Sequence, residues 1–223
     1  PPTEEGACCK GSAGVLRRMY ELGVRMMTLT WNHENELASP QRNPSGVLVP
    51  QTEKGLTGKG FEFLAEMERL HMIVDVSHLS DKGFWDIARH GTRPFAASHS
   101  NCRALAPHTR NLTDEMIRAL SERGGIAGLN YYALFLDTDP THPENCRSTA
   151  ALIAKHAAHY KQVGGAQMIA LGSDFDGIDG PHQLENAAFL PLLADALRKE
   201  GFTEDEVEGI YYRNAMRFFE ENL

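Results

Sequence analysis

Ile73-Val74-Asp75-Val76-Ser77-His78 and Pro94-Phe95-Ala96-Ala97-Ser98-His99 share one construction, a short apolar run that ends in Ser-His. Each run is too short for a helix and is typical of a buried strand. Histidine is a common zinc ligand, so two imidazoles at the ends of neighbouring strands can share a metal ion. The simpler alternative is that each histidine caps its own loop through a backbone hydrogen bond.

The same pattern recurs along the rest of the chain, where short apolar runs alternate with longer stretches of 3.6-residue periodicity. The further runs are residues 24–30, 126–130 and 168–172. The periodic stretches predict helices at residues 13–22, 60–70, 81–90, 113–123, 149–164, 190–200 and 204–222. Strands that alternate with helices in this way indicate an α/β fold with a parallel sheet.

Polar side chains stand at or just beyond the carboxyl end of each run: Thr30, His78, His99, Asn130 and Asp174. In a closed (β/α)8 TIM-like barrel these ends converge on one face, which favours a barrel over a doubly wound open sheet. No repeat or low-complexity linker interrupts residues 1–223, and one domain is the simplest organisation.

The last run continues as Gly172-Ser173-Asp174-Phe175-Asp176-Gly177. Beside a metal site, Asp174 can take a proton from the attacking water and pass it to a leaving amine. The alternative is an Asx-type turn before Gly177. A calcium loop is excluded, because the remaining ligand positions are missing.

The amino-acid composition limits the classes of molecule that the chain is expected to bind. Lys plus Arg number 22 against 30 Asp plus Glu, and the net charge of -8 argues against nucleic acid and anionic membranes as partners. No apolar stretch approaches the roughly 20 residues that span a bilayer. The four cysteines suggest neither a disulfide framework nor a zinc knuckle, and the N-terminus does not resemble a signal peptide. We therefore expect a cytoplasmic protein that acts on a small molecule, and a homodimer is possible.

Four ordered blocks together resemble the membrane (renal) dipeptidases of the amidohydrolase superfamily, from about Thr3 to the C-terminus. They are Gly23-Val24-Arg25-Met26-Met27-Thr28-Leu29-Thr30-Trp31-Asn32, Val74-Asp75-Val76-Ser77-His78, Ala97-Ser98-His99-Ser100 and Gly172-Ser173-Asp174-Phe175-Asp176-Gly177. The resemblance implies a (β/α)8 barrel with two zinc ions. It also implies a zinc-dependent dipeptidase that hydrolyses the peptide bond of dipeptides through a metal-bridging hydroxide.

The resemblance assigns roles to individual residues. A glutamate bridges both metals in this family, and its counterpart here is Glu5, with the adjacent Glu4 as the alternative register. His78 and His99 bind one of the two ions. Asp174 is the catalytic proton shuttle.

Four further residues are expected to bind the substrate. Arg110 matches the family arginine that holds the terminal carboxylate of the dipeptide, a task suited to the paired donors of a guanidinium. His33 is the nearest candidate for a family histidine that contacts the substrate, with Trp31 as the other possible position. Asn130 and Tyr132 resemble the segment that lines the cleft. Taken without the resemblance, Arg110 also fits a solvated loop.

One feature departs from the family pattern. The His-x-Asp pair that ends the first barrel strand in the family occurs nowhere in this sequence. If Asp174 closes strand eight, then Glu5 lies on strand three, and strands one and two fall before Pro1. We expect residues 1–223 to be the C-terminal six βα units of a barrel. Two alternatives remain: a hydrolase of another amide, a lactone or a cyclic imide, or a barrel impaired in catalysis by the missing metal ligands.

Overall fold

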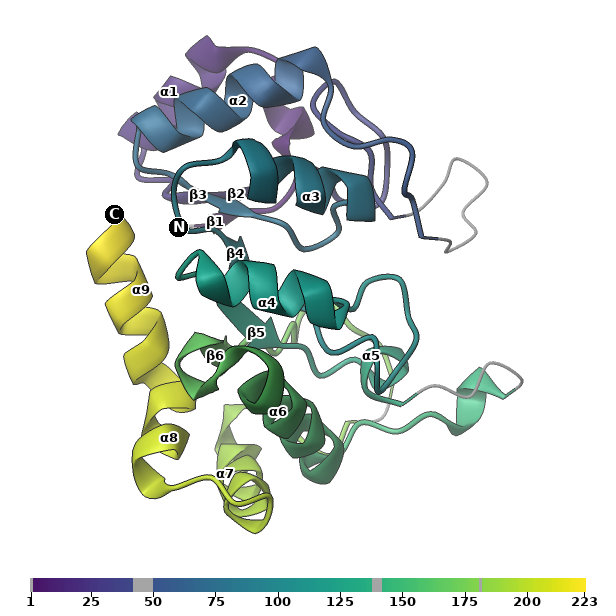
Figure 1. Cartoon of the computed structure of the whole chain (residues 1–223). Coiled ribbons are helices and arrows are strands. Elements are labelled where there is room, and N and C mark those ends of the chain that lie inside the picture. Colours follow the sequence, from purple (N-terminus) through teal and green to yellow (C-terminus); the bar gives the residue numbers. More distant parts are fainter. Residues whose placement is uncertain (1, 42–49, 138–141, 181) are drawn as a thin grey trace. The chain divides into compact units, whose positions relative to one another are not determined.

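Short parallel strands alternate with longer helices along the chain in the computed structural model, which describes residues 2–41, 50–137, 142–180 and 182–223 (Figure 1). The chain divides into two compact units, Pro1–Ala96 with Phe219–Leu223, and Ala97–Phe218. Both β4 (Ala96–Ala97) and α9 (Asn214–Asn222) run from one unit into the other. The α/β fold with parallel strands that the sequence predicts is confirmed, and closure of an eight-stranded barrel stays a prediction.

The strands of the first unit pair in parallel and in chain order. They are β1 (Pro2–Thr3), β2 (Met26–Thr28), β3 (Ile73–Asp75) and the beginning of β4. The connecting helices are η1 (Gly6–Cys9), α1 (Ala13–Glu21), α2 (Gly58–Arg69) and α3 (Asp81–His90). Arg17 of α1 pairs with Glu66 of α2 at 2.6 Å, which joins the two helices.

The second unit holds the end of β4, then β5 (Ile126–Leu129) paired in parallel with β6 (Ile169–Leu171). Helix α6 packs against α4 and α7 (Figure 1). The helices of this unit are α4 (Asp114–Glu122), α5 (Ala133–Leu136), η2 (Pro143–Asn145), α6 (Ala150–Gly164), η3 (Ala166–Met168), η4 (Ala187–Phe189), α7 (Leu190–Lys199), α8 (Glu204–Glu208), η5 (Gly209–Arg213) and α9.

Most of the longer helices begin after a hydroxyl side chain that accepts a hydrogen bond from the first turn. Ser80 accepts from the N–H of Gly83 at the start of α3, and Thr113 accepts from Met116 at the start of α4. Thr203 forms a full capping box with Glu206. Each cap satisfies an amide that would otherwise lack a partner, so the helix starts follow from local sequence.

The ends of β4, β5 and β6 meet in the second unit at two glycines. A Cβ atom on Gly128 or Gly172 would lie 2.0 or 2.1 Å from the carbonyl oxygen of Ser98, so only glycine fits at either position. The N–H of Ser100 donates to the carbonyl of Gly128 at 2.9 Å, which continues the pairing past the end of β4. This close approach places the residues that follow each strand near one another within the unit.

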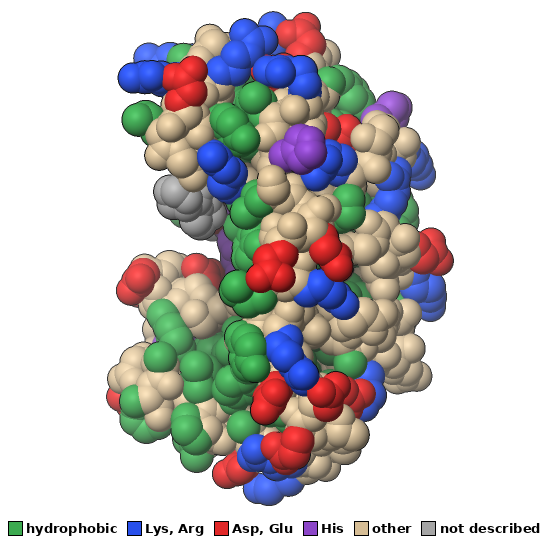
Figure 2. All heavy atoms as spheres, turned by 90° about the vertical axis from the view of Figure 1, so that its left-hand side faces the viewer, with side chains coloured by type: hydrophobic (Ala, Val, Ile, Leu, Met, Phe, Trp, Pro, Cys, Tyr) green, Lys and Arg blue, Asp and Glu red, His purple; other side chains and the backbone are tan. Residues whose placement is uncertain are grey.

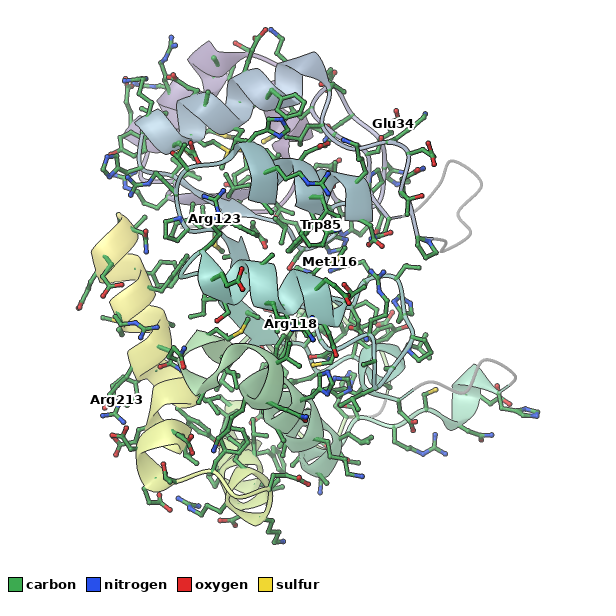
Figure 3. All side chains as sticks on the ribbon, viewed as in Figure 1. Glu34, Trp85, Met116, Arg118, Arg123 and Arg213 are labelled. Atoms are coloured by element: carbon green, nitrogen blue, oxygen red, sulfur yellow. The ribbon has the colours of Figure 1, made fainter. Side chains whose placement is uncertain are left out.

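The C-terminal stretch is helical throughout residues 204–222, as the sequence predicts. The structure adds a π-helical segment, η5, between α8 and α9. Asn214 explains this segment, because its side-chain amide donates to the carbonyl oxygens of Ala166 and Ile169 at 2.9 and 2.8 Å. Arg213 points away from the ribbon (Figure 3) and pairs with Asp205 at 2.6 Å. A widened turn thus satisfies the carbonyls that lead into β6.

Acidic and basic side chains are interspersed on the face that Figure 2 presents. The interspersed charges leave no continuous surface of one sign on this face. Among the ion pairs of the described residues, Arg198 pairs with Glu204 at 2.6 Å and with Asp195 at 2.9 Å. Exposed pairs of this kind each contribute little to stability.

Among the residues that the structure describes, no helix combines the length and the apolar character that a membrane crossing requires.

His156 of α6 is a buried structural residue, 1% exposed. Its Nδ1 accepts the N–H of Cys102 at 3.0 Å, and its Nε2 lies 3.1 Å from the carbonyl of Leu136, which only a neutral Nε2–H tautomer satisfies. Burial lowers the pKa of His156 to about 4, while the Leu136 carbonyl opposes the shift. The neutral imidazole therefore joins α6 to the loop at Cys102 and to the end of α5.

We predict that His156 contributes acid sensitivity to the fold. Its pKa is lower in the folded than in the unfolded chain, so its contribution is complete above about pH 6.5 and is lost as the pH falls toward 4. His156→Gln should be less stable near pH 7 by roughly 1–3 kcal/mol, yet lose less stability than the wild type between about pH 6.5 and pH 4.5. Urea unfolding at both pH values measures this, and an equal acid loss in both proteins would contradict it.

Candidate active site

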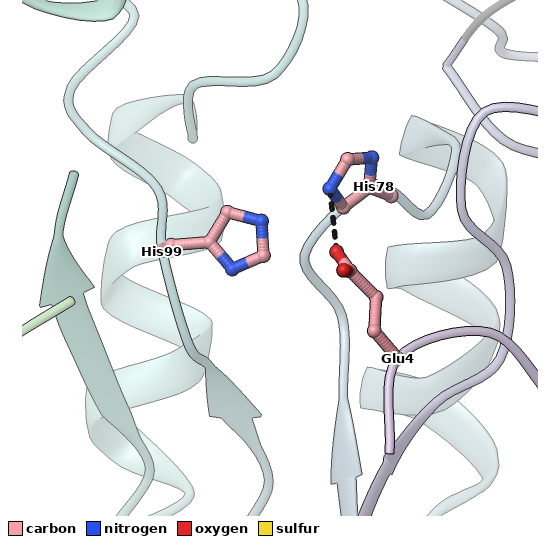
Figure 4. A group of neighbouring side chains, drawn as sticks. All are labelled: Glu4, His78 and His99. Atoms are coloured by element: carbon pink, nitrogen blue, oxygen red, sulfur yellow. Dashed lines mark ion pairs between the residues drawn. The ribbon is translucent and has the colours of Figure 1, made fainter. Parts of the chain in front are cut away.

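The first unit brings a carboxylate and an imidazole together at the carboxyl ends of its strands. Glu4 follows β1 directly, and His78 lies three residues beyond Asp75 at the end of β3. The Oε1 of Glu4 is 3.0 Å from the Nε2 of His78 (Figure 4). The glutamate that faces His78 is therefore Glu4, which the sequence offered as the alternative to Glu5. Glu5 is the N-cap of η1 and has φ 78°.

His78 is held by neighbours on both sides. Its Nδ1 lies 3.1 Å from the side-chain oxygen of Asn32, so an Nδ1–H donor leaves the Nε2 lone pair directed at Glu4. The 3.0 Å distance fits an imidazolium that donates its Nε2–H to the carboxylate, and it also fits a neutral imidazole that binds a cation together with the carboxylate. An imidazole oriented through its far nitrogen and a nearby carboxylate form a donor set suited to zinc.

Asp75 determines how the chain leaves β3. Its carboxylate is 2% exposed and accepts the hydroxyl of Thr28 at 2.6 Å and the N–H of Ser77 at 3.0 Å. These bonds join β2 to β3 and fix the residue before His78. His78 itself has φ 70°, a left-handed conformation that costs energy for a side chain of its size. The surrounding bonds hold the strained backbone in place.

Of the two candidates for the substrate-contacting position near β2, Trp31 lies beside His78 and His33 lies beside Trp31. The ring centroid of Trp31 is 6.0 Å from that of His33 and 6.3 Å from that of His78. Trp31 is 39% exposed, and His33 is exposed as well. The structure therefore places an aromatic surface next to the Glu4–His78 pair, with His33 at its outer side.

His99 occupies the matching strand end in the second unit, where its Nδ1 lies 2.8 Å from the hydroxyl of Ser98. The segment around it is fixed by Tyr160 of α6, whose hydroxyl donates to the carbonyls of Ser100 and Asn101 at 2.8 and 3.2 Å. His99 is partly exposed. Its neighbours along the chain are thus clamped while the imidazole stays accessible.

Asp174 follows β6 and is joined to the end of β5. The side-chain amide of Asn130 donates to its Oδ2 at 3.1 Å. Asp174 has φ 61°, and a Cβ atom on Gly177 would lie 2.4 Å from its Oδ1, so the turn wraps closely around the carboxylate. The Asx-type turn and the catalytic interpretation are therefore compatible. Asp176 is exposed on the outer side of this turn.

Arg110 lies against an aromatic wall in the second unit. The side chain is 7% exposed, and its guanidinium carbon is 5.4 Å from the ring centroid of Phe135. Tyr132 and His108 also pack on Phe135, at centroid distances of 5.1 and 4.5 Å. Burial lowers the pKa of His108 to about 4, with the charges of Arg110 and Arg103 acting in the same direction. A buried cation beside a neutral imidazole suits an anionic group of a ligand.

Sequence reasoning missed the asparagines that hold this wall. Asn101 accepts the N–H of Asn130 at 3.0 Å and donates to its carbonyl at 2.9 Å. Asn111 accepts the N–H of Asn101 and donates to the carbonyls of Ala106 and Phe135. Both are fully buried. In the sequence, these residues are recognisable only as asparagines close to a strand end or to Arg110. Hydrophobic periodicity does not predict hydrogen bonds between loops.

Comparison with known proteins adds to this geometry. The sequence model of a family described as membrane dipeptidase (peptidase family M19) matches residues 2–222. An uncharacterized protein from the pqqA 5' region of Klebsiella pneumoniae is 38% identical over 207 residues, which are 93% of this chain and 75% of that protein. An uncharacterized dipeptidase of Schizosaccharomyces pombe is 36% identical over 92% of this chain and 48% of its own length.

A solved structure is similar as well. The metallopeptidase from Rhodobacter sphaeroides, liganded with a phosphinate mimic of the dipeptide L-Ala-D-Ala, superposes with a TM-score of 0.85 at 31% identity. The match covers 98% of this chain and 62% of that structure. The chain thus spans about half the length of the yeast relative and less than two thirds of the bacterial structure.

Proposed function

The chain belongs to the membrane dipeptidase family, peptidase family M19, and we propose that it forms most of a zinc-dependent site that hydrolyses the peptide bond of dipeptides. The observation that carries the proposal is the Glu4–His78 pair, a carboxylate and an imidazole 3.0 Å apart beyond the carboxyl ends of β1 and β3. The names of the yeast relative and the ligand of the bacterial structure support the substrate class.

Glu4, His78 and His99 are the proposed metal ligands, each with an atom that zinc accepts. The strand register supports His99. Asp75 of β3 pairs with Ala96 of β4, and a histidine follows each of these residues at the third position. The two Ser-His dipeptides thus occupy corresponding positions in the sequence after a pair of residues in register, which supports the proposal that both histidines bind metal.

Glu4, His78 and His99 would hold zinc, which would supply a Lewis acid and an activated water for the attack on the peptide carbonyl. The chain's own residues then bind and orient the dipeptide. Arg110 pairs with its C-terminal carboxylate, while Tyr132 and Phe135 form the apolar wall beside that contact. A guanidinium in a fixed position selects a substrate whose free carboxylate lies close to the scissile bond.

Asp174 moves the proton. As the water oxygen adds to the peptide carbonyl carbon, the Asp174 carboxylate takes the proton, and it returns that proton to the amide nitrogen when the C–N bond breaks. The Asn130 amide, 3.1 Å from Oδ2, holds the carboxylate in orientation during both transfers. His33 or Trp31 borders the site beside His78. A homodimer and a cytoplasmic location stay predictions from the sequence.

One prediction of this proposal tests whether Glu4 or Glu5 is the metal ligand. Glu4→Gln should weaken zinc binding by at least roughly tenfold, because it removes a carboxylate that faces His78. Glu5→Gln is the matched control and should bind zinc like the wild type. Competition with a chromogenic chelator measures both affinities, and the reverse ranking would return the ligand role to Glu5.

A second prediction concerns Arg110. Arg110→Ala should raise KM for L-Ala-L-Ala and L-Ala-D-Ala by more than roughly tenfold at unchanged zinc content. The corresponding dipeptide amide lacks the carboxylate, so its hydrolysis should be equally poor in both proteins. If the variant instead lost the acid and the amide in the same proportion, Arg110 would not be the carboxylate ligand.

A third prediction tests the proton shuttle. Asp174→Asn should keep the fold and most of the metal and lower kcat by roughly 10² to 10⁴ with little change in KM. The exposed Asp176 offers the matched control, and Asp176→Asn should retain activity. An inactive Asp176→Asn beside an active Asp174→Asn would move the role two residues along the chain.

A further inference from the structure

Three sulfur atoms gather in the first unit, away from the residues of the proposed dipeptide site. The thiols of Cys8 and Cys9, on η1, lie 3.9 and 3.6 Å from the thioether sulfur of Met19, on α1. All four cysteines of the chain are free thiols. Cys9 is completely buried, Cys8 is exposed and Met19 is half-buried, so the group is open to solvent on one side only.

The spacing suits a metal ion. With metal–sulfur bonds of about 2.3 Å, three sulfurs in a trigonal plane stand about 4 Å apart. The Cys9–Met19 and Cys8–Met19 sulfur distances of 3.6 and 3.9 Å come close to this value, and they are also ordinary contact distances between packed sulfur atoms. What favours a ligand set is the chemistry of the group, since two thiols and one thioether meet from η1 and α1.

The backbone holds the group in place. Ser12, whose N–H donates to the carbonyl of Cys9 at 2.9 Å, is also the N-cap of α1 through its hydroxyl and the N–H of Val15. Lys10, in the left-handed conformation, donates from its N–H to the carbonyl of Ala7 and ends η1. The turn that carries both thiols is thus tied directly to the helix that carries Met19.

We propose that Cys8, Cys9 and Met19 form a binding site for one soft monovalent cation, Cu(I). Thiolates and thioethers prefer soft ions, whereas carboxylate and imidazole groups such as those of Glu4 and His78 suit zinc. The two sites therefore differ in ligand chemistry. Binding replaces the two thiol protons by one cation and releases them to solvent.

The buried thiol sets a condition on binding. Burial raises the pKa of Cys9 to about 12, and the neighbouring Cys8 adds to the rise. At neutral pH both sulfurs therefore begin as thiols, and the cation has to displace their protons. A soft ion that bonds strongly to sulfur can displace these protons, whereas a cation that bonds weakly to sulfur cannot.

The test is an anaerobic titration of the purified protein with Cu(I) in competition with bicinchoninate. The wild type should retain one Cu(I) per chain against the chelator. Cys8→Ser should lower the affinity by more than roughly 100-fold, since losing a direct ligand exceeds the 10- to 100-fold cost of losing an outer-shell partner. Met19→Leu should weaken binding by a smaller factor, because a thioether is the weaker ligand.

Cys146→Ser, on the second unit, is the matched control and should bind Cu(I) like the wild type. Cys8 is exposed, so its variant should also keep the wild-type thermal unfolding and zinc content, which separates this site from the proposed dipeptide site. Wild-type affinity in Cys8→Ser would overturn the proposal. So would a wild-type protein that yields all its Cu(I) to the chelator.

Discussion

The parallel register around β3 is the constraint on which the site depends. Asp75 pairs with Thr28 on one side and with Ala96 on the other, so three strands leave the sheet at a common level. The same buried carboxylate accepts the Thr28 hydroxyl and the Ser77 amide. A slip of one residue would turn the side chains of β3 to the opposite face and remove both bonds. Register and buried hydrogen bonds therefore support each other.

In the second unit, buried polar groups take the corresponding role. Asn101 and Asn111 satisfy backbone groups that loops would otherwise leave without partners, and Asn130 orients Asp174. Such groups are costly to bury unless every bond is made, and a complete network admits one arrangement. The loops that carry Arg110 and Tyr132 owe their definition to this network more than to apolar packing.

Three histidines have different roles because their environments in the fold differ. His156 is buried between two backbone partners and serves the fold in its neutral form. His108 is kept neutral by burial and by two arginines, which leaves the positive charge at Arg110. His78 reaches the strand end with Nε2 directed at Glu4. Their order along the chain reveals none of these differences, because each depends on distant residues.

The sequence by itself determined the alternation of strands and helices, the helix starts and the Ser-His strand ends, because these features follow from local periodicity and capping. Only the tertiary structure shows which of Glu4 and Glu5 faces His78, since the backbone turn at Glu5 separates two chemically identical side chains. It also placed a π-helical turn, η5, within the C-terminal helix, where Asn214 reaches carbonyls 45 and 48 residues away. Contacts at such separations arise only when the chain has folded, and local patterns do not encode them.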